Sequence, residues 1–187
     1  ISVMEDVSKA ISMEAKVHRD LVYVVGLTYD ELGGSHYYEL NGFIGNRVPK
    51  VEPNSGRKLM ETLSEAISRG LVRACHDCSE GGIGVACAEM AFAGGLGMEI
   101  DLRRVPLGEN IERNDHILFS ESNTRFIVEV GEDRRKAFEE AMGPNPFGLI
   151  GNLSERDQFT VTGLSGKLVV SEKIGELKEA WQKPLRW

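Results

Sequence analysis

The sequence predicts an α/β domain in which helices flank a mixed β-sheet. Two observations support this. Apolar, β-branched runs alternate with helical patterns through most of the chain, and three short strand patterns follow one another near its end. The 187 residues are 41% hydrophobic, which is enough for one large domain with its own core. No internal repeat or low-complexity segment interrupts the pattern.

The first elements follow from an apolar run and from the residues that interrupt it. Residues 21–27 are continuously apolar, which is typical of a buried strand. A glycine-rich turn comes next, and Ser35 is expected to cap a short helix that contains Tyr37, Tyr38 and Leu40. The following stretch is rich in Gly and Pro and is predicted to be a loop.

The middle of the chain is predicted to contain two helices around one strand. Asn54 or Ser55 is expected to cap the first helix, and Gly70 to end it. Its apolar side chains recur one turn apart, at Leu59, Leu63 and Ile67. A strand over residues 71–74 follows. The next helix, residues 83–93, is apolar on most sides and is therefore expected to be buried.

The last part of the chain is predicted to be rich in strands. A strand at 97–102 leads into a polar segment that reaches Asp115. A strand at 126–130 and a helix at 132–142 come next. An amphipathic helix containing Trp181 closes the chain. The three strands between the last two helices are expected at 147–153, 158–162 and 167–170.

Composition excludes several classes of protein. The net charge is −7 and the basic residues are scattered, which argues against binding to nucleic acid or to an anionic membrane. There is no signal-peptide pattern and no apolar run of about 20 residues. Three cysteines are too few for a disulfide framework, so we expect a cytoplasmic protein. The chain begins at Ile1, inside an expected strand at 1–4, as an excised fragment would.

The most informative stretch is the polar turn at residues 75–82, between an expected strand and an expected helix. Such a turn directs backbone N–H groups and the positive end of the helix at one point, which favours anions. The candidate phosphate-binding or nucleotide-binding residues here are Asp77, Ser79, Gly81 and Gly82. In the alternative interpretation, the glycines only permit a tight turn and Asp77 or Ser79 caps the helix. The turn lacks the lysine of a P-loop and the G-x-G-x-x-G pattern of a dinucleotide-binding fold.

Cysteines in the same stretch suggest a different chemistry. Cys75 and Cys78 form a C-x-x-C at a strand-to-helix turn, as in redox dithiols, although the glycines follow the pair instead of preceding it. Cys87 is most simply a core residue. A zinc site is weakly supported, because the further histidines lack the spacing of a ligand pair. These histidines are His18, His36 and His116.

Two further polar turns are candidates for a binding cleft. Glu121, Ser122, Asn123 and Arg125 precede a buried strand and would supply substrate-facing groups. Gly33, Gly34 and Ser35 would supply a second cradle of N–H groups for phosphate. Each turn has the alternative of satisfying only local backbone groups. No catalytic triad or close carboxylate pair is evident, and adjacent His76 and Asp77 should point apart, so no residue of this chain is predicted to be catalytic and none to bind a metal.

Five segments in this order resemble the C-terminal part of the phosphoribosylformylglycinamidine synthase family. They are DLVYVVGLT (20–28), ELGGS (31–35) with Tyr37 and Tyr38, GNRVPKV (45–51), HDCSEGG (76–82) with AEMA (88–91), and FSESNTRF (119–126). The resemblance implies a superfamily that includes aminoimidazole ribonucleotide synthetase, selenophosphate synthetase and thiamine-monophosphate kinase. Its members pair an N-terminal barrel-forming half with an α/β C-terminal half and use ATP.

The resemblance also implies a place in a larger enzyme. Residues 1–20 would be the tail of a preceding N-terminal-type domain, and residues 21–187 the C-terminal-type ligase domain. The whole enzyme would be an amidotransferase ligase of purine biosynthesis that converts formylglycinamide ribonucleotide to its amidine. ATP and Mg²⁺ would be held mostly by residues outside this chain. The expected partners are the other domains of the synthetase, a glutaminase subunit and a small accessory subunit.

Some roles carry over by resemblance. A Glu-Ser-Gln segment of the family contacts substrate, and its counterpart by internal pseudo-symmetry is Glu121-Ser122-Asn123, with Asn in place of Gln. The double-glycine turns would face phosphate. A valine is common in the family where this chain has Cys78, which argues against a redox role. An auxiliary nucleotide-binding or structural module, another member of the superfamily, and a C-x-x-C oxidoreductase stay open as alternatives.

Overall fold

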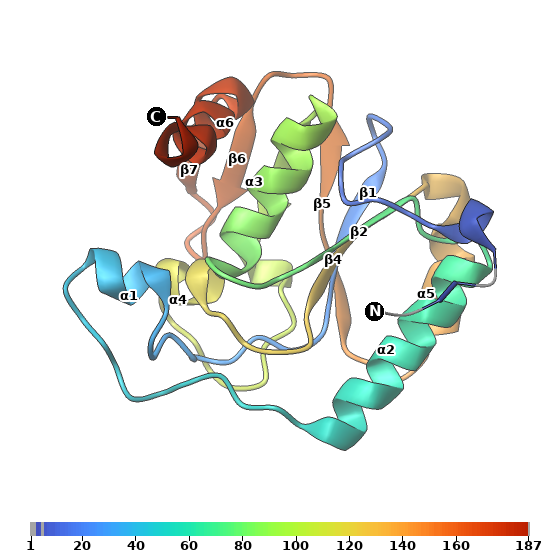
Figure 1. Ribbon diagram of the computed structural model, residues 1–187, viewed down its shortest axis with the longest axis horizontal. Helices are drawn as coiled ribbons and strands as arrows, with labels where there is room; N and C mark the ends of the chain where they lie inside the picture. Colours follow the sequence, from blue (N-terminus) through green and yellow to red (C-terminus); the bar gives the residue numbers. More distant parts are fainter. Residues whose placement is uncertain (1–2, 5, 187) are drawn as a thin grey trace.

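The protein is built on a seven-stranded mixed sheet (Figure 1). The structure is a computed structural model that describes residues 3, 4 and 6–186. The strand order is β2-β4-β1-β5-β3-β6-β7, and every neighbouring pair is antiparallel except β3 and β6. The strands are β1 (Leu21–Val25), β2 (Ala74–Asp77), β3 (Gly97–Asp101), β4 (Phe126–Val130), β5 (Phe147–Ser154), β6 (Phe159–Thr162) and β7 (Leu168–Glu172). The predicted fold class is confirmed.

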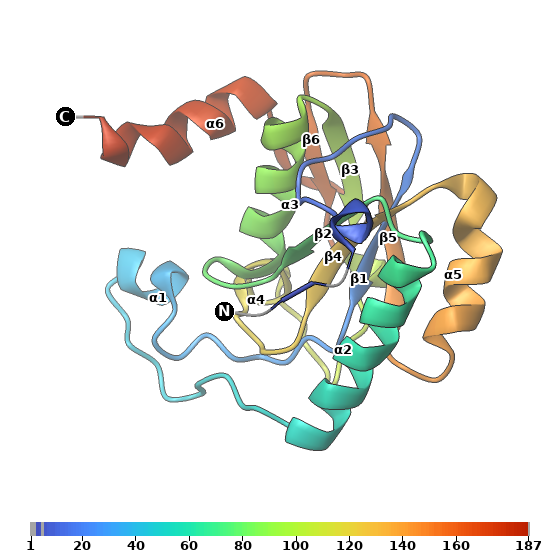
Figure 2. The same cartoon turned by 45° about the vertical axis from the view of Figure 1, so that its right-hand side comes forward.

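Helices cover both faces of the sheet, so the interior strand β1 is buried and apolar at every position. Figure 2 shows α2 and α5 on one side of the sheet and α3 on the other. Along β1, Val22 and Val24 pack into the cluster that contains α3, whereas Tyr23 and Val25 pack into the cluster under α2 and α5. The helices are α1 (His36–Leu40), α2 (Pro53–Ser68), α3 (Gly82–Gly94), α4 (Asn114–Phe119), α5 (Arg135–Met142) and α6 (Ile174–Gln182).

Several expectations about local structure are confirmed. The Ser35 hydroxyl caps α1 by accepting the Tyr38 N–H at 3.2 Å. Helix α3 begins and ends within one residue of the expected bounds, and β4 has the expected bounds. Strand β1 begins at the expected Leu21 but ends at Val25, two residues earlier than predicted. These features depend on neighbouring residues, which the sequence displays directly.

Other expectations about local structure are wrong. Strand β2 begins at Ala74 instead of residue 71, because Leu71 and Val72 pack into the core under α2 before the chain joins β4. Helix α2 begins at Pro53, whose fixed φ suits the first helical position, and neither Asn54 nor Ser55 caps it.

Two more differences concern the segment before Ser120 and the first residues of the chain. The short helix α4 was not expected, and packing of Ile117 and Leu118 in the core accompanies it. Of the expected strand at residues 1–4, residues 1 and 2 lie outside the described part, and Val3 and Met4 are not in a strand. None of the described helices is long and apolar enough to cross a membrane.

The segment before β1 is hydrogen-bonded to the sheet through a buried carboxylate. Glu129 of β4 is fully buried, and its two oxygens accept the backbone N–H groups of Lys16 at 2.8 Å and Val17 at 2.9 Å. Asp20 is buried beside it and pairs with Arg73 at 2.6 Å. Burial raises the pKa of Glu129 to about 7.

This carboxyl group should make stability depend on pH. Because its pKa is higher in the folded than in the unfolded state, its contribution is complete below about pH 4.5 and is lost as pH rises through about 7. We expect the free energy of unfolding, measured in urea at several pH values, to fall over this range more steeply in the parent protein than in Glu129→Gln. Equal slopes in the two proteins would contradict the raised pKa.

Candidate functional site

The three polar turns singled out in the sequence meet at Glu121. Its Oε1 accepts the backbone N–H of Gly81 at 2.9 Å and that of His36, the first residue after Ser35, at 3.4 Å. The Glu121 N–H donates to the carbonyl of Glu31 at 3.2 Å. The turn at 121–125 therefore joins the start of α1 to the start of α3, although these segments lie far apart in the sequence.

The double-glycine turn already holds a carboxylate. Gly81 and Gly82 both have positive φ, at 76° and 60°. The Gly81 N–H donates to Glu121, and the Gly82 N–H donates to the Ser79 carbonyl at 3.1 Å. A Cβ on Gly82 would overlap the backbone carbonyl of Ser120, so this position requires glycine for packing. An external phosphate would reach the Gly81 N–H only if Glu121 moved away.

The Gly33-Gly34-Ser35 turn holds a loop instead of presenting free donors. Its three N–H groups donate to the carbonyls of Arg47 at 2.8 Å, Ile44 at 2.7 Å and Leu32 at 3.1 Å. The first two bonds bind the turn to the segment between α1 and α2. The expected N–H cradle for phosphate at this turn is thus occupied by the chain's own backbone.

Two of the four residues expected to face substrate point into the protein instead. Arg125 is 1% exposed and donates to the carbonyls of Ser120 and Ser122 and to the hydroxyl of Thr28. Burial lowers the pKa of its guanidinium. Ser122 is also buried, and its hydroxyl accepts the N–H of Tyr29 at 3.0 Å. Their hydrogen bonds shape the turn, because buried polar groups must find partners.

Glu121 and Asn123 stay accessible and line a cavity with Asp77 and Ser79. This cavity of about 410 Å³ also includes Glu80. The Ser79 hydroxyl donates to the Asp77 carboxylate, which lowers the pKa of Asp77. Helix α3 has no side-chain cap, so the interpretation of Asp77 or Ser79 as its cap is wrong. With three carboxylates, the lining favours the hydrogen-bond donors of a ligand over phosphate oxygens.

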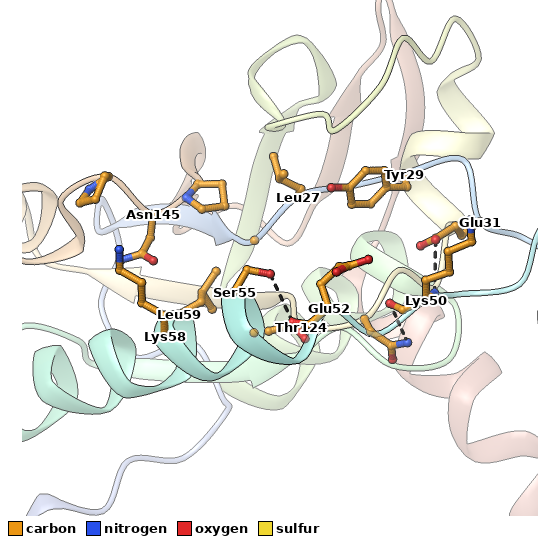
Figure 3. Close-up of a pocket in the computed structure, with 15 residues that line it drawn as sticks. Leu27, Tyr29, Glu31, Lys50, Glu52, Ser55, Lys58, Leu59, Thr124 and Asn145 are labelled. Atoms are coloured by element: carbon orange, nitrogen blue, oxygen red, sulfur yellow. Dashed lines mark hydrogen bonds between the residues drawn. The ribbon is translucent and has the colours of Figure 1, made fainter.

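A second cavity, of about 290 Å³, lies on the other side of Asn123 and Thr124 (Figure 3). Its lining brings together lysines and glutamates from α2, the segment before it and the segment after β1, namely Lys50, Lys58, Glu31 and Glu52. Figure 3 shows Lys50 and Lys58 toward opposite ends of this cavity. None of these four residues was predicted from the sequence to lie in a site.

Thr124 is the strained residue of the site and was also missed. Its φ is 59°, in the left-handed region that β-branched residues rarely adopt. A Cβ on Gly26 would overlap the Thr124 carbonyl, and one on Gly56 would lie 3.1 Å from its hydroxyl. Gly56, a glycine within the helical pattern of α2, was the available signal of this close approach. Such strain is frequently found where ligands bind.

The cysteines lack the features of a redox dithiol. Among the described residues all three are free, and Cys78 and Cys87 are buried. Burial raises the pKa of Cys75 to about 12 and that of Cys78 to about 11. A reactive thiol requires a lowered pKa. The raised pKa values therefore argue against the alternative in which the C-x-x-C is a redox dithiol.

The histidines each have a carboxylate neighbour of their own. His76 lies 2.8 Å from Glu89 and 3.4 Å from Asp77, so the expectation that His76 and Asp77 point apart is wrong. The zinc candidates pair separately, with Glu155, Glu39 and Asp30 for His18, His36 and His116. Within residues 3, 4 and 6–186, no group of three or more His, Cys, Asp or Glu side chains is placed to hold a metal. The described residues thus do not form a complete magnesium site.

Comparisons with known proteins agree with this fold and with the motifs. Residues 20–163 match the family described as AIR synthase related protein, C-terminal domain. Phosphoribosylformylglycinamidine synthase subunit PurL of Alkaliphilus metalliredigens is 32% identical over all of the chain and 24% of its own length. The subunit PurL of Methanothrix thermoacetophila is 37% identical, again over all of the chain and 24% of its own length.

Solved structures of related fold cover most of the chain. Thermotoga maritima PurL complexed with FGAR has a TM-score of 0.80 at 23% identity, over 91% of this chain and 30% of the other. E. coli HypE has a TM-score of 0.60 at 22% identity, over 87% of this chain and 51% of the HypE chain. The chain spans about a quarter of the length of the curated relatives named above. The chain belongs to the AIR synthase related protein family and contains its C-terminal domain.

Proposed function

We propose that this chain is the C-terminal domain of an ATP-dependent ligase that converts formylglycinamide ribonucleotide to formylglycinamidine ribonucleotide in purine biosynthesis. In this reaction ATP phosphorylates the amide oxygen, and ammonia released from glutamine displaces the phosphate. The observation that carries the proposal is similarity along the entire chain to two PurL subunits, at 32% and 37% identity. Solved structures of Thermotoga maritima PurL complexed with ATP and with FGAR add support.

The partners follow from the same relatives. A structure of PurLQS from Thermotoga maritima shares this fold, with a TM-score of 0.76. We therefore expect the chain to work beside the remaining domains of its synthetase, a glutaminase subunit and a small accessory subunit. The boundary at residue 20, between a preceding domain and this one, stays a prediction.

Within that enzyme, the 410 Å³ cavity is the part of this chain best suited to contact a ligand. Glu121, Asp77 and Asn123 offer carbonyl and carboxylate oxygens that would accept hydrogen bonds from hydroxyl or amide N–H groups. ATP supplies the phosphoryl group, and the residues of this chain would position what it reacts with. Phosphate binding at Gly81 and Gly82 would require Glu121 to release the Gly81 N–H.

An auxiliary or structural role is the second candidate. It is favoured because the donors of both glycine turns are engaged within the chain. A full-length protein containing this chain should form the amidine from formylglycinamide ribonucleotide, ATP and glutamine, and the chain alone should not. Absence of this activity from the full-length protein with its partner subunits would refute the ligase proposal.

Glu121→Ala in the full-length protein separates the two roles when its urea unfolding matches that of the parent protein, because Glu121 also accepts the N–H groups of Gly81 and His36. If the cavity contacts substrate, we expect kcat/KM for the ligase reaction to fall at least about tenfold, which corresponds to about 1.4 kcal/mol of transition-state binding. Glu155→Ala is the control, because that side chain is 74% exposed and its ion pair is with His18, away from the cavity. Unchanged kcat/KM in Glu121→Ala would assign the chain to a structural role.

A further inference from the structure

A third cavity, separate from the two beside the 121–125 turn, lies between α1, the segment after it, and the start of α4. Its volume is about 310 Å³, at the lower end of the range of about 300–1,000 Å³ for small-molecule sites. The lining residues are Tyr37, Tyr38, Asn41, Phe43, Ile44, Gly45, Arg113 and His116. None of them lines either of the other two cavities.

Aromatic rings form much of this lining, and their positions are set by contacts. The Tyr38 ring lies edge-on to Phe43 and to His116, with centroids 6.0 Å and 6.3 Å away. Tyr37 stacks on Phe119 at 4.7 Å, and its hydroxyl donates to Asp115 at 2.7 Å. Gly45 packs so closely against Tyr38 that a Cβ there would overlap the ring. Fixed rings around a cavity favour a flat ligand.

In its neutral form, His116 supplies an oriented hydrogen-bond acceptor. Its Nδ1 lies 2.7 Å from the Asp30 carboxylate, which in its ionised form only accepts, so the proton of the neutral ring is on Nδ1. Arg47 forms ion pairs with Asp30 at 3.3 Å and with Glu109 at 2.6 Å. The His116 Nε2 has no hydrogen-bond partner among the described residues. It is therefore available to accept a bond from a ligand.

Charges around the cavity are paired. Arg113 bonds to Asp115 through two nitrogens, and Arg47 is neutralised by Asp30 and Glu109. The net charge of −7 opposes binding of a polyanion such as nucleic acid. A balanced lining with rings and one acceptor fits an uncharged, planar ligand that donates a hydrogen bond.

We propose that this cavity binds the base of a free nucleoside, a planar nitrogen heterocycle with an exocyclic amino group. The base packs against Tyr38 and Phe43, and its amino group donates to His116 Nε2. The proposal stands without the ligase function, because it rests only on the lining of this cavity. Base binding and ligase activity are measured separately, so failure of one does not imply failure of the other.

Isothermal titration calorimetry of adenosine into the protein tests the proposal. We expect saturable binding that weakens at least about tenfold in Tyr38→Leu, because stacking of a base on an aromatic ring contributes roughly that much or more. Tyr38→Phe keeps the ring and should bind like the parent protein. His116→Phe should weaken adenosine but not purine riboside, which lacks the exocyclic amino group and has no other ring N–H donor. Phe92→Leu, which removes a ring packed on Trp181, is the control.

Three outcomes would overturn the proposal. The first is no saturable adenosine binding to the parent protein at millimolar concentration. The second is equal adenosine affinity in Tyr38→Leu and Tyr38→Phe when both unfold cooperatively. The third is an effect of these variants on self-association alone, measured by sedimentation, which would make the aromatic surface a contact between protein molecules. The purine riboside comparison in His116→Phe keeps the test decisive if Tyr38→Leu does not fold.

Discussion

Arg125→Met should lower the free energy of unfolding by at least about 3 kcal/mol, because it removes three hydrogen bonds from buried acceptors. The guanidinium is 1% exposed and bonds to the carbonyls of Ser120 and Ser122 and to the hydroxyl of Thr28. Methionine fills similar space but donates nothing, so these acceptors would be left buried and unsatisfied. Urea unfolding of the two proteins measures the difference.

A matched change at an exposed arginine serves as the control. Arg156 is 82% exposed, and its nearest carboxylate oxygen, from Glu99, is 4.0 Å away. Arg156→Met should change the free energy of unfolding by no more than about 0.5 kcal/mol. If Arg125→Met were as mild as this control, the guanidinium would not be what holds the 121–125 turn.

Gly82→Ala should be the other severe change, destabilising the protein by several kcal/mol. Its left-handed φ of 60° costs an alanine about 1–2 kcal/mol. The added Cβ would also overlap the Ser120 carbonyl, which cannot move without displacing the 121–125 turn. Urea or thermal unfolding measures the loss.

Gly95 separates the two causes. Its φ is 69°, but a Cβ there would meet nothing within 4 Å. Gly95→Ala should therefore show only the backbone cost, about 1–2 kcal/mol. Equal losses in Gly82→Ala and Gly95→Ala would mean that the close approach to Ser120 is unimportant. Because any side chain at Gly82 disturbs packing, Glu121→Ala is the better probe of ligand binding at the 410 Å³ cavity.

The packing at Gly82 and the bonds of Arg125 place the same restraint on the site. Both act on the backbone between Ser120 and Arg125, and Glu121 then links this backbone to Gly81 and His36. The accessible side chains of Glu121 and Asn123 therefore extend from a turn whose backbone is fixed by the buried Arg125 and by packing against Gly82. Preorganisation of this kind is what positions polar groups for a ligand.

Much of the fold was accessible from neighbouring residues alone. The apolar run that became β1, the Ser35 cap of α1 and the bounds of α3 each depend on a few consecutive side chains. The order of five motifs was enough to identify the family, because such motifs depend on residue identity and not on contacts.

Only the tertiary structure decided which polar groups are free. The sequence correctly predicted turns at Gly33, Gly34 and Gly81. The hydrogen-bond acceptors of their N–H groups lie 10 to 40 residues away in the sequence, at Arg47, Ile44 and Glu121. The same holds for the burial of Arg125 and for the pairing of His116 with Asp30 across 86 residues. Local sequence sets backbone preference, whereas long-range packing determines which donors and acceptors are already satisfied.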